Sequence, residues 1–170
     1  MLAVFERFLV TLSRVLAVIG LTGLLVLAVM TLTDGLLRSL ANHPVDAVRD
    51  MGGMVAAMSV ACCLPIALLE RSNITIRFLG AFFGRGTGEA AERFAAIVVL
   101  LLVAAMARQF FLFSRDAASN GDATWILNIP TAPFWYVVDT MFGIAMLAQF
   151  LVTVRVLQGR SVPVPRLDVH

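Results

Sequence analysis

The sequence contains no lysine, and only 14% of its 170 residues are charged. Without lysine, a phosphate-binding P-loop is excluded. The two histidines, His43 and His170, lie outside the long apolar runs, so no run offers an axial ligand for haem. The two cysteines, Cys62 and Cys63, are adjacent and form neither a CxxC redox pair nor a disulfide framework. No HExxH or GxSxG motif occurs. We therefore expect a protein that is not an enzyme and has no metal or cofactor.

What the sequence does contain is long apolar runs. Its hydrophobic fraction is 60% and its mean hydropathy is +0.92, far above the values of soluble domains. Four runs, at about residues 15–37, 48–69, 93–114 and 133–156, can each cross a hydrocarbon core of about 30 Å as a helix. The connections between them are too short for a soluble domain of about 50 residues. The sequence thus predicts an all-α membrane protein, with one domain over residues 1–170 and four transmembrane helices in the lipid bilayer.

The placement of the arginines predicts how these helices cross the membrane. With the N-terminus inside, four of the thirteen basic residues lie toward the outside, and the other nine lie on the cytoplasmic side, as the positive-inside rule requires. Both termini, including the tail at residues 157–170, are then cytoplasmic. The net charge of +2 is the excess of thirteen arginines over eleven acidic residues, and because the topology accounts for the placement of the arginines we expect no nucleic-acid partner. The nine inner residues are Arg7, Arg14, Arg71, Arg77, Arg85, Arg93, Arg155, Arg160 and Arg166.

The connection between the second and third predicted helices mixes apolar and basic residues. Arginine stems can cover apolar surface while their charged ends stay in water. We therefore expect an amphipathic segment that lies in the headgroup plane. A docking surface for another subunit is the alternative. The residues that define this membrane-interface segment are Arg71, Arg77, Phe78, Phe82 and Arg85.

Two charged residues fall inside predicted spans. Arg108 precedes the outer end of the third span and Asp139 follows the outer end of the fourth, each by six residues, so both lie about 9 Å below those ends. An unpaired arginine at a helix centre costs about 2.5 to 3.5 kcal/mol. We therefore expect a partner for Arg108, with Asp139 the first candidate and Asp34 the second. A structural ion pair is the favoured interpretation, and an intersubunit contact or an ion path are the alternatives.

Small residues recur on the first two predicted helices, where they allow helices to approach one another closely. Packing within the chain and contact with another subunit both explain them. They are Gly20, Gly23, Gly52, Gly53 and Ala56.

Two further features are local. Pro65 predicts a kink in the second helix, because proline lacks an N–H group and its ring clashes with the preceding turn. At the predicted outer surface, Trp125, Trp135 and Tyr136 fit an aromatic belt.

Three short motifs follow one another along the chain: DGLLR at residues 34–38, ERSNITIR at residues 70–77 and IPTAPFW at residues 129–135. Their order in a four-span chain of this size resembles the small permease subunit of tripartite ATP-independent periplasmic (TRAP) transporters. The family often has His and Asp where this chain has Asn73 and Arg77, and paired acidic residues where it has Arg49 and Asp50. The positions that carry the resemblance are Arg38, Asn42, Pro44, Asn73, Ile74, Pro133, Trp135 and Gly143.

This resemblance implies a multi-pass subunit of the bacterial inner membrane. Its expected partners are a large multi-span permease, which carries the solute with an ion gradient, and a periplasmic solute-binding protein. The solute is expected to be a carboxylate-type organic acid. The small subunit is expected to enlarge the fixed scaffold and to help dock the binding protein.

Two other classes of membrane protein are alternatives to this hypothesis. An autonomous, homo-oligomeric membrane channel or exporter is the main alternative, although charges within the spans are sparse. A membrane oxidoreductase subunit would need cofactor ligands that the spans lack.

Overall fold

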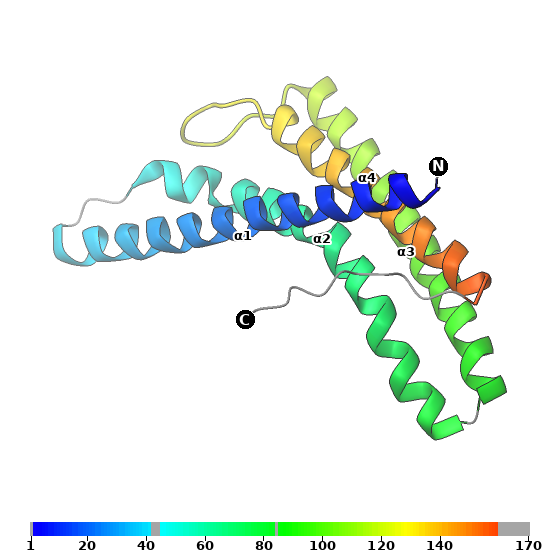
Figure 1. Ribbon diagram of the computed structural model, residues 1–170. Helices are drawn as coiled ribbons and strands as arrows, with labels where there is room; N and C mark the ends of the chain where they lie inside the picture. Colours follow the sequence, from blue (N-terminus) through cyan, green and yellow to red (C-terminus); the bar gives the residue numbers. More distant parts are fainter. Residues whose placement is uncertain (1, 42–44, 84, 160–170) are drawn as a thin grey trace.

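Four long helices make up the structure, a computed structural model that describes the backbone of residues 2–41, 45–83 and 85–159 and the side chains of residues 5–40, 45–70 and 90–159. The helices are α1 (Leu2–Ala41), α2 (Asp46–Phe83), α3 (Arg85–Asn120) and α4 (Ala132–Leu157) (Figure 1). Each contains a segment long and apolar enough to span a membrane. Over the described residues, the only β pairing is an isolated bridge. The predicted all-α membrane fold with four spans is confirmed, and the orientation of the termini stays a prediction.

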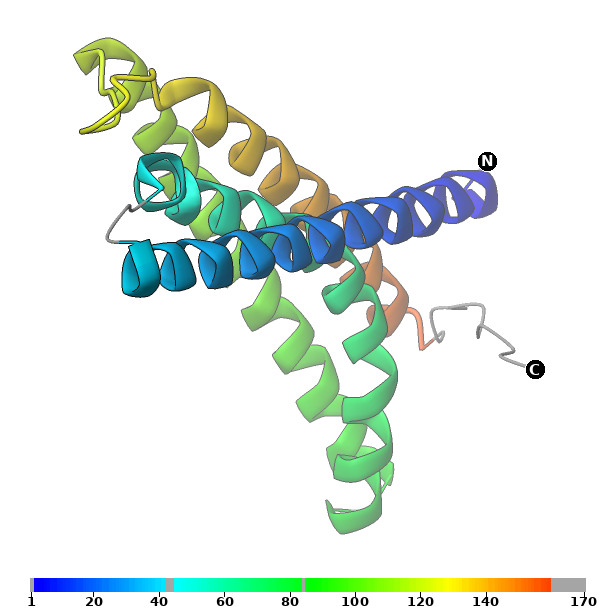
Figure 2. The same cartoon turned by 90° about the vertical axis from the view of Figure 1, so that its left-hand side faces the viewer.

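Each helix extends beyond the span predicted for it. Hydropathy marks only the apolar part of a helix, whereas its backbone hydrogen bonding continues into the polar flanks. The difference is largest for α1, whose apolar part Phe5–Leu40 has 36 residues and is about 54 Å long at 1.5 Å per residue. This exceeds a hydrocarbon core of about 30 Å, so α1 must tilt or extend past it. In both ribbon views α1 crosses α3 and α4 instead of running alongside them (Figures 1 and 2).

The direction of α2 changes along its length. Its first half runs beside α1, and its second half turns away toward the beginning of α3 (Figures 1 and 2). Pro65 lies inside the helix, and its side chain is fully buried. Loss of one backbone hydrogen bond and the clash of the proline ring account for a bend in this region.

Two small apolar clusters hold the helices together. One joins α1, α2 and α4 through Leu9, Val10, Leu69, Ala148, Leu151 and Val152. The other joins α2 to α4 through Ala61, Val138 and Phe142, and Ala107 and Phe110 of α3 pack against it. α4 contributes to both clusters. In its apolar window 44% of the residues are buried, compared with 6% in that of α1. The core therefore lies along α4, and α1 is attached at the edge of the bundle.

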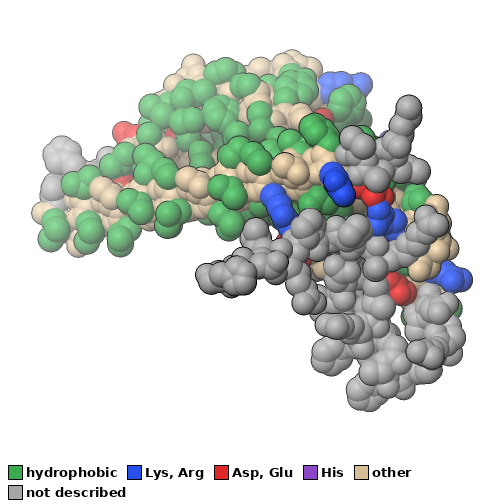
Figure 3. All heavy atoms as spheres, viewed as in Figure 1, with side chains coloured by type: hydrophobic (Ala, Val, Ile, Leu, Met, Phe, Trp, Pro, Cys, Tyr) green, Lys and Arg blue, Asp and Glu red, His purple; other side chains and the backbone are tan. Residues whose placement is uncertain are grey.

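The surface of the chain is largely apolar between its two ends. Figure 3 shows hydrophobic side chains along most of α1, with charged side chains near its left-hand end and around its right-hand part. Exposed large apolar side chains on α1 run from Phe5 to Leu40, and a further set lies on α3 from Phe94 to Phe113. In water such a surface would be unfavourable, whereas a bilayer or another membrane subunit covers it without cost.

Candidate functional site

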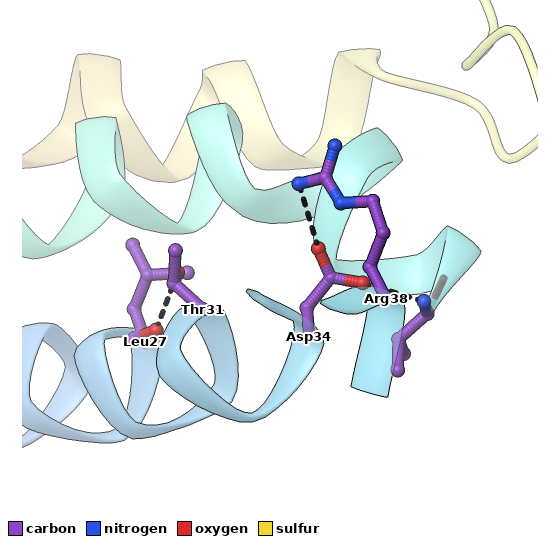
Figure 4. Close-up of polar contacts among 5 residues, drawn as sticks. Leu27, Thr31, Asp34 and Arg38 are labelled. Atoms are coloured by element: carbon purple, nitrogen blue, oxygen red, sulfur yellow. Dashed lines mark hydrogen bonds and ion pairs between the residues drawn. The ribbon is translucent and has the colours of Figure 1, made fainter. Parts of the chain in front are cut away.

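The outer end of α1, so named from the predicted topology, is organised by Asp34. Its carboxylate is 4% exposed, and its Oδ1 accepts the backbone N–H of Val45 at 2.6 Å. Its Oδ2 lies 3.6 Å from a terminal nitrogen of Arg38, one helical turn further along α1 (Figure 4). Because Val45 directly precedes α2, the first of these contacts fixes where α2 begins relative to α1. Asp34 is therefore engaged by its own neighbours and is not the partner of Arg108.

The predicted pair of Arg108 and Asp139 is not formed within the chain. Arg108 is exposed on α3, and Asp139 is half-buried on α4. Two ion pairs between described side chains join Arg38 to Asp34 and Arg155 to Glu6, and neither involves Arg108 or Asp139. Equal depth along two neighbouring helices does not bring two side chains together, because each must also point from the facing side of its helix. Contact of Arg108 with another subunit stays a prediction.

The small residues predicted on α1, Gly20 and Gly23, both lie close to α2. A Cβ atom on Gly20 would lie 2.5 Å from the backbone oxygen of Ser59, and one on Gly23 would lie 2.5 Å from Ser59 Oγ. These two glycines therefore permit α1 and α2 to pack within the chain.

The small residues of α2 face different surroundings. A Cβ on Gly52 would make an ordinary contact with Leu27 at 3.7 Å, and one on Gly53 would meet nothing within 4 Å. Ala56 is half-buried. Gly53 is thus the member of the predicted set that faces outward.

The positions that carry the family resemblance lie in several places. Pro133 occupies the first turn of α4, where the missing N–H of proline has no cost. Trp135 packs edge-on against Phe113, with 4.9 Å between ring centroids. A Cβ on Gly143 would meet nothing within 4 Å. Asn42 and Pro44 lie outside the described residues, as do the side chains of Asn73 and Ile74.

The predicted membrane-interface segment is helical in its backbone. It continues α2 as far as Phe83 and forms the beginning of α3 from Arg85. The side chains of Arg71, Arg77, Phe78, Phe82 and Arg85 lie outside the described residues, so their place at the membrane surface stays a prediction.

Asp50 holds the loop between α3 and α4, a contact that the sequence analysis missed. Its Oδ1 accepts the backbone N–H groups of Trp125 at 3.1 Å and Ile126 at 3.2 Å, and its Oδ2 accepts that of Leu127 at 2.8 Å. Three charge-assisted hydrogen bonds to one carboxylate form a strong and geometrically specific contact. The partners lie 75 to 77 residues apart in the sequence, and no local pattern links them.

The opposite end of the bundle carries a second contact that was not predicted. The guanidinium of Arg155 on α4 donates hydrogen bonds to the carboxylate of Glu6 on α1. A signal was available in this case, since the predicted topology places both residues at the cytoplasmic ends of their helices.

Two buried polar side chains of α4 also tie it to α3. Gln149 Nε2 and Thr153 Oγ1 both donate to the backbone oxygen of Ala96, at 3.3 and 3.2 Å. In a membrane bundle, such interhelical bonds satisfy side chains that would otherwise lack partners.

Within the described residues, no three His, Cys, Asp or Glu side chains come together as metal ligands would. The polar contacts described above thus join helices to one another and hold the loop between α3 and α4.

Comparison with known families gives a match over residues 27–159, which is most of the chain. The matching family is described as tripartite ATP-independent periplasmic transporters, DctQ component. Searches of curated proteins and of solved structures found no match. The matched region begins in α1 and ends just after α4, so it includes all or part of every helix.

Proposed function

The chain belongs to the DctQ component family of tripartite ATP-independent periplasmic transporters, and from this premise we propose that it scaffolds the large permease subunit and helps to dock the solute-binding protein. As a member of this family with four apolar helices, it is a multi-pass protein of the inner membrane. The transported solutes, in this proposal, are carboxylate-type organic acids, moved by the large subunit at the expense of an ion gradient.

The observation that carries the scaffold role is the unburied apolar surface of α1. Only 6% of the residues in an apolar window of this helix are buried in the chain. The outer half of α1 forms a shallow apolar groove lined by Leu24, Leu27, Ala28, Thr31, Leu32, Gly35 and Leu36. A helix that leaves this much surface free at the edge of its own bundle is suited to pack on a second membrane protein.

Glycines without a close neighbour inside the chain also support contact with a partner. Glycine in a helix costs about 0.5 to 1 kcal/mol relative to alanine, so a helical glycine needs a structural reason. Gly20 and Gly23 have one inside the chain, whereas a Cβ on Gly35, Gly53 or Gly143 would meet nothing within 4 Å. Close approach of a partner helix supplies a reason for these three.

Arg108 supports contact with a partner as well. It is an exposed charge within α3, and the described side chains include no acidic group paired with it. Because an arginine inside a membrane is costly without a partner, an acidic or carbonyl group of the large subunit fits this position.

Docking of the solute-binding protein is proposed at the outer end. Arg38, Arg49, Arg115 and Asp122 are exposed there. Charges of both signs on a protruding surface favour recognition of a soluble protein and speed its association.

The test is copurification of the large permease subunit from the native host in mild detergent, together with organic-acid uptake by whole cells. Gly35 lines the groove on α1, and a Cβ there would meet nothing within 4 Å, so Gly35→Leu adds bulk to the groove from a position with open space. We expect this variant to fold normally, to lose the large subunit during purification and to lose uptake. The matched control is Ala105→Leu, which adds similar bulk at an exposed position of α3 and should retain the subunit.

Recovery of the wild-type chain alone as a homo-oligomer, with uptake unaffected by deletion of its gene, would contradict the proposal. That result would favour an autonomous channel or exporter.

A further inference from the structure

The loop between α3 and α4 presents an apolar tip. Trp125 is 100% exposed, and Ile126 and Leu127 are about half-exposed. No charged residue occurs from Ala123 to Val138. Isolated exposed apolar residues are common on protein surfaces, but three in succession at the tip of a loop indicate contact with another apolar phase.

Several backbone N–H groups of this loop have hydrogen-bond acceptors. An isolated antiparallel bridge joins Ala123 to Pro130 at its neck, and Thr124 donates to Ile129 at 2.9 Å. The donors at the tip itself are satisfied by the carboxylate of Asp50, which accepts three consecutive N–H groups. The loop therefore reaches from the ends of α3 and α4 toward the beginning of α2 (Figures 1 and 2).

This arrangement removes the main obstacle to placing a loop in a water-poor region. Backbone N–H groups without partners are costly away from water, and an irregular tip normally exposes several of them. Here Asp50 accepts three of them, and the same three bonds stabilise its charged carboxylate. The exposed side chains can then leave water while these three N–H groups keep their acceptor.

From these contacts we propose that Asp50 holds residues 125–127 so that their side chains insert into the headgroup layer of the outer leaflet. The occupant of this surface is lipid, because the helix ends that flank the loop also carry exposed apolar side chains, namely Phe113 of α3 and Tyr136 and Val137 of α4. Tryptophan beside a headgroup layer is favoured by its apolar ring and its indole N–H. The inference is independent of the proposed function, since it requires no other subunit.

The test uses the fluorescence of Trp125 in the full-length chain with Trp135→Phe, so that Trp125 is the single reporter. The protein is reconstituted in vesicles of phosphatidylethanolamine and phosphatidylglycerol, with or without lipids brominated close to the headgroup. We expect bromolipid to quench Trp125 strongly and aqueous acrylamide to quench it weakly. Trp125 emission that acrylamide quenches freely and bromolipid does not affect would overturn the proposal.

The role of Asp50 is tested in the same background. Asp50→Ala should shift the emission to longer wavelength, reduce quenching by bromolipid and increase quenching by acrylamide. The matched control is Asp46→Ala, one turn earlier on α2 at an exposed position, which should change none of these. If Asp50→Ala does not fold, as judged by circular dichroism, Asp50→Asn keeps the shape and removes the charge. An unchanged emission and quenching profile in a folded Asp50 variant would contradict the role of Asp50.

A protein occupant is distinguished by repeating the measurement with the copurified complex. Shielding of Trp125 that occurs only when other subunits are present, and not in vesicles of the chain alone, would refute insertion into lipid.

Discussion

Arg155, near the end of α4, donates a hydrogen bond from Nε to Glu6 Oε1 on α1 at 2.6 Å, and its terminal nitrogen donates to the second carboxylate oxygen. The two side chains are mostly buried, at 17% and 18% exposure. They lie beside the apolar cluster that contains Leu9 and Val152. The pair therefore joins the first helix to the last one where α1 enters the core.

This geometry predicts a measurable coupling. Arg155→Ala should lower the free energy of unfolding by about 1 to 3 kcal/mol, because it leaves a partly buried carboxylate without its donor. Glu6→Gln should also destabilise, and the double variant should lose less than the sum. Thermal unfolding in detergent measures all three. Arg7→Ala, at an exposed neighbouring position, is the control and should change little. Strictly additive losses would show that the two side chains do not interact.

The packing of α1 on α2 predicts opposite effects for the same substitution at two glycines. Gly20→Ala places a Cβ 2.5 Å from the backbone oxygen of Ser59, and overpacking of this kind costs about 1 to 3 kcal/mol. Gly53→Ala meets nothing and should stabilise α2 by about 0.5 to 1 kcal/mol. Unfolding temperatures in detergent give the sign of each effect. Equal effects of the two substitutions would contradict the observed packing.

Gly23 offers a sharper version of this test, because its neighbour is a side chain. Gly23→Ala alone should destabilise, since its Cβ would lie 2.5 Å from Ser59 Oγ. Ser59→Ala removes that oxygen and should restore much of the stability in the double variant. Failure of Ser59→Ala to rescue Gly23→Ala would show that the close contact lies elsewhere.

Asp34 and Arg38 should contribute very unequally to the free energy of unfolding. Asp34→Ala leaves the part-buried Val45 N–H without its acceptor, at a cost of about 1 to 3 kcal/mol. Arg38 is 60% exposed, and Arg38→Ala should cost about 0 to 1 kcal/mol. Asp34→Asn keeps an acceptor oxygen and should fall between the two. Thermal unfolding ranks the three variants, and an Arg38→Ala loss as large as that of Asp34→Ala would refute this assignment.

Arg108 should affect retention of the large subunit more than it affects the stability of the isolated chain. In the isolated protein, Arg108→Ala and Asp139→Ala should have additive effects on unfolding, because no ion pair joins them. In copurification, Arg108→Ala should reduce retention of the large subunit, whereas Gln109→Ala, at the neighbouring exposed position, should not. Non-additive effects in the isolated chain would restore the pairing with Asp139.

Much of the architecture follows directly from hydropathy. In a bilayer, every backbone polar group must be satisfied within its own segment, so an apolar run long enough to cross can only be a helix. Four spans could therefore be predicted without knowing how the helices pack against one another. Helix ends were less well predicted, as the early start of α1 at Leu2 shows, because the charged residues Glu6, Arg7 and Arg14 interrupt the hydropathy signal without ending the helix.

The contacts between helices depended on the tertiary structure. The helical period predicts which residues share a face, but it does not determine how far each helix is rotated toward its neighbour. Arg108 and Asp139 lie at matching depths and still do not pair, whereas Asp50 meets a loop 75 residues away. The sequence by itself therefore determined that this protein is a four-helix membrane subunit. Only the packing of the helices decided which glycines are internal, which carboxylate holds the outer loop and which surface of α1 is left for a partner.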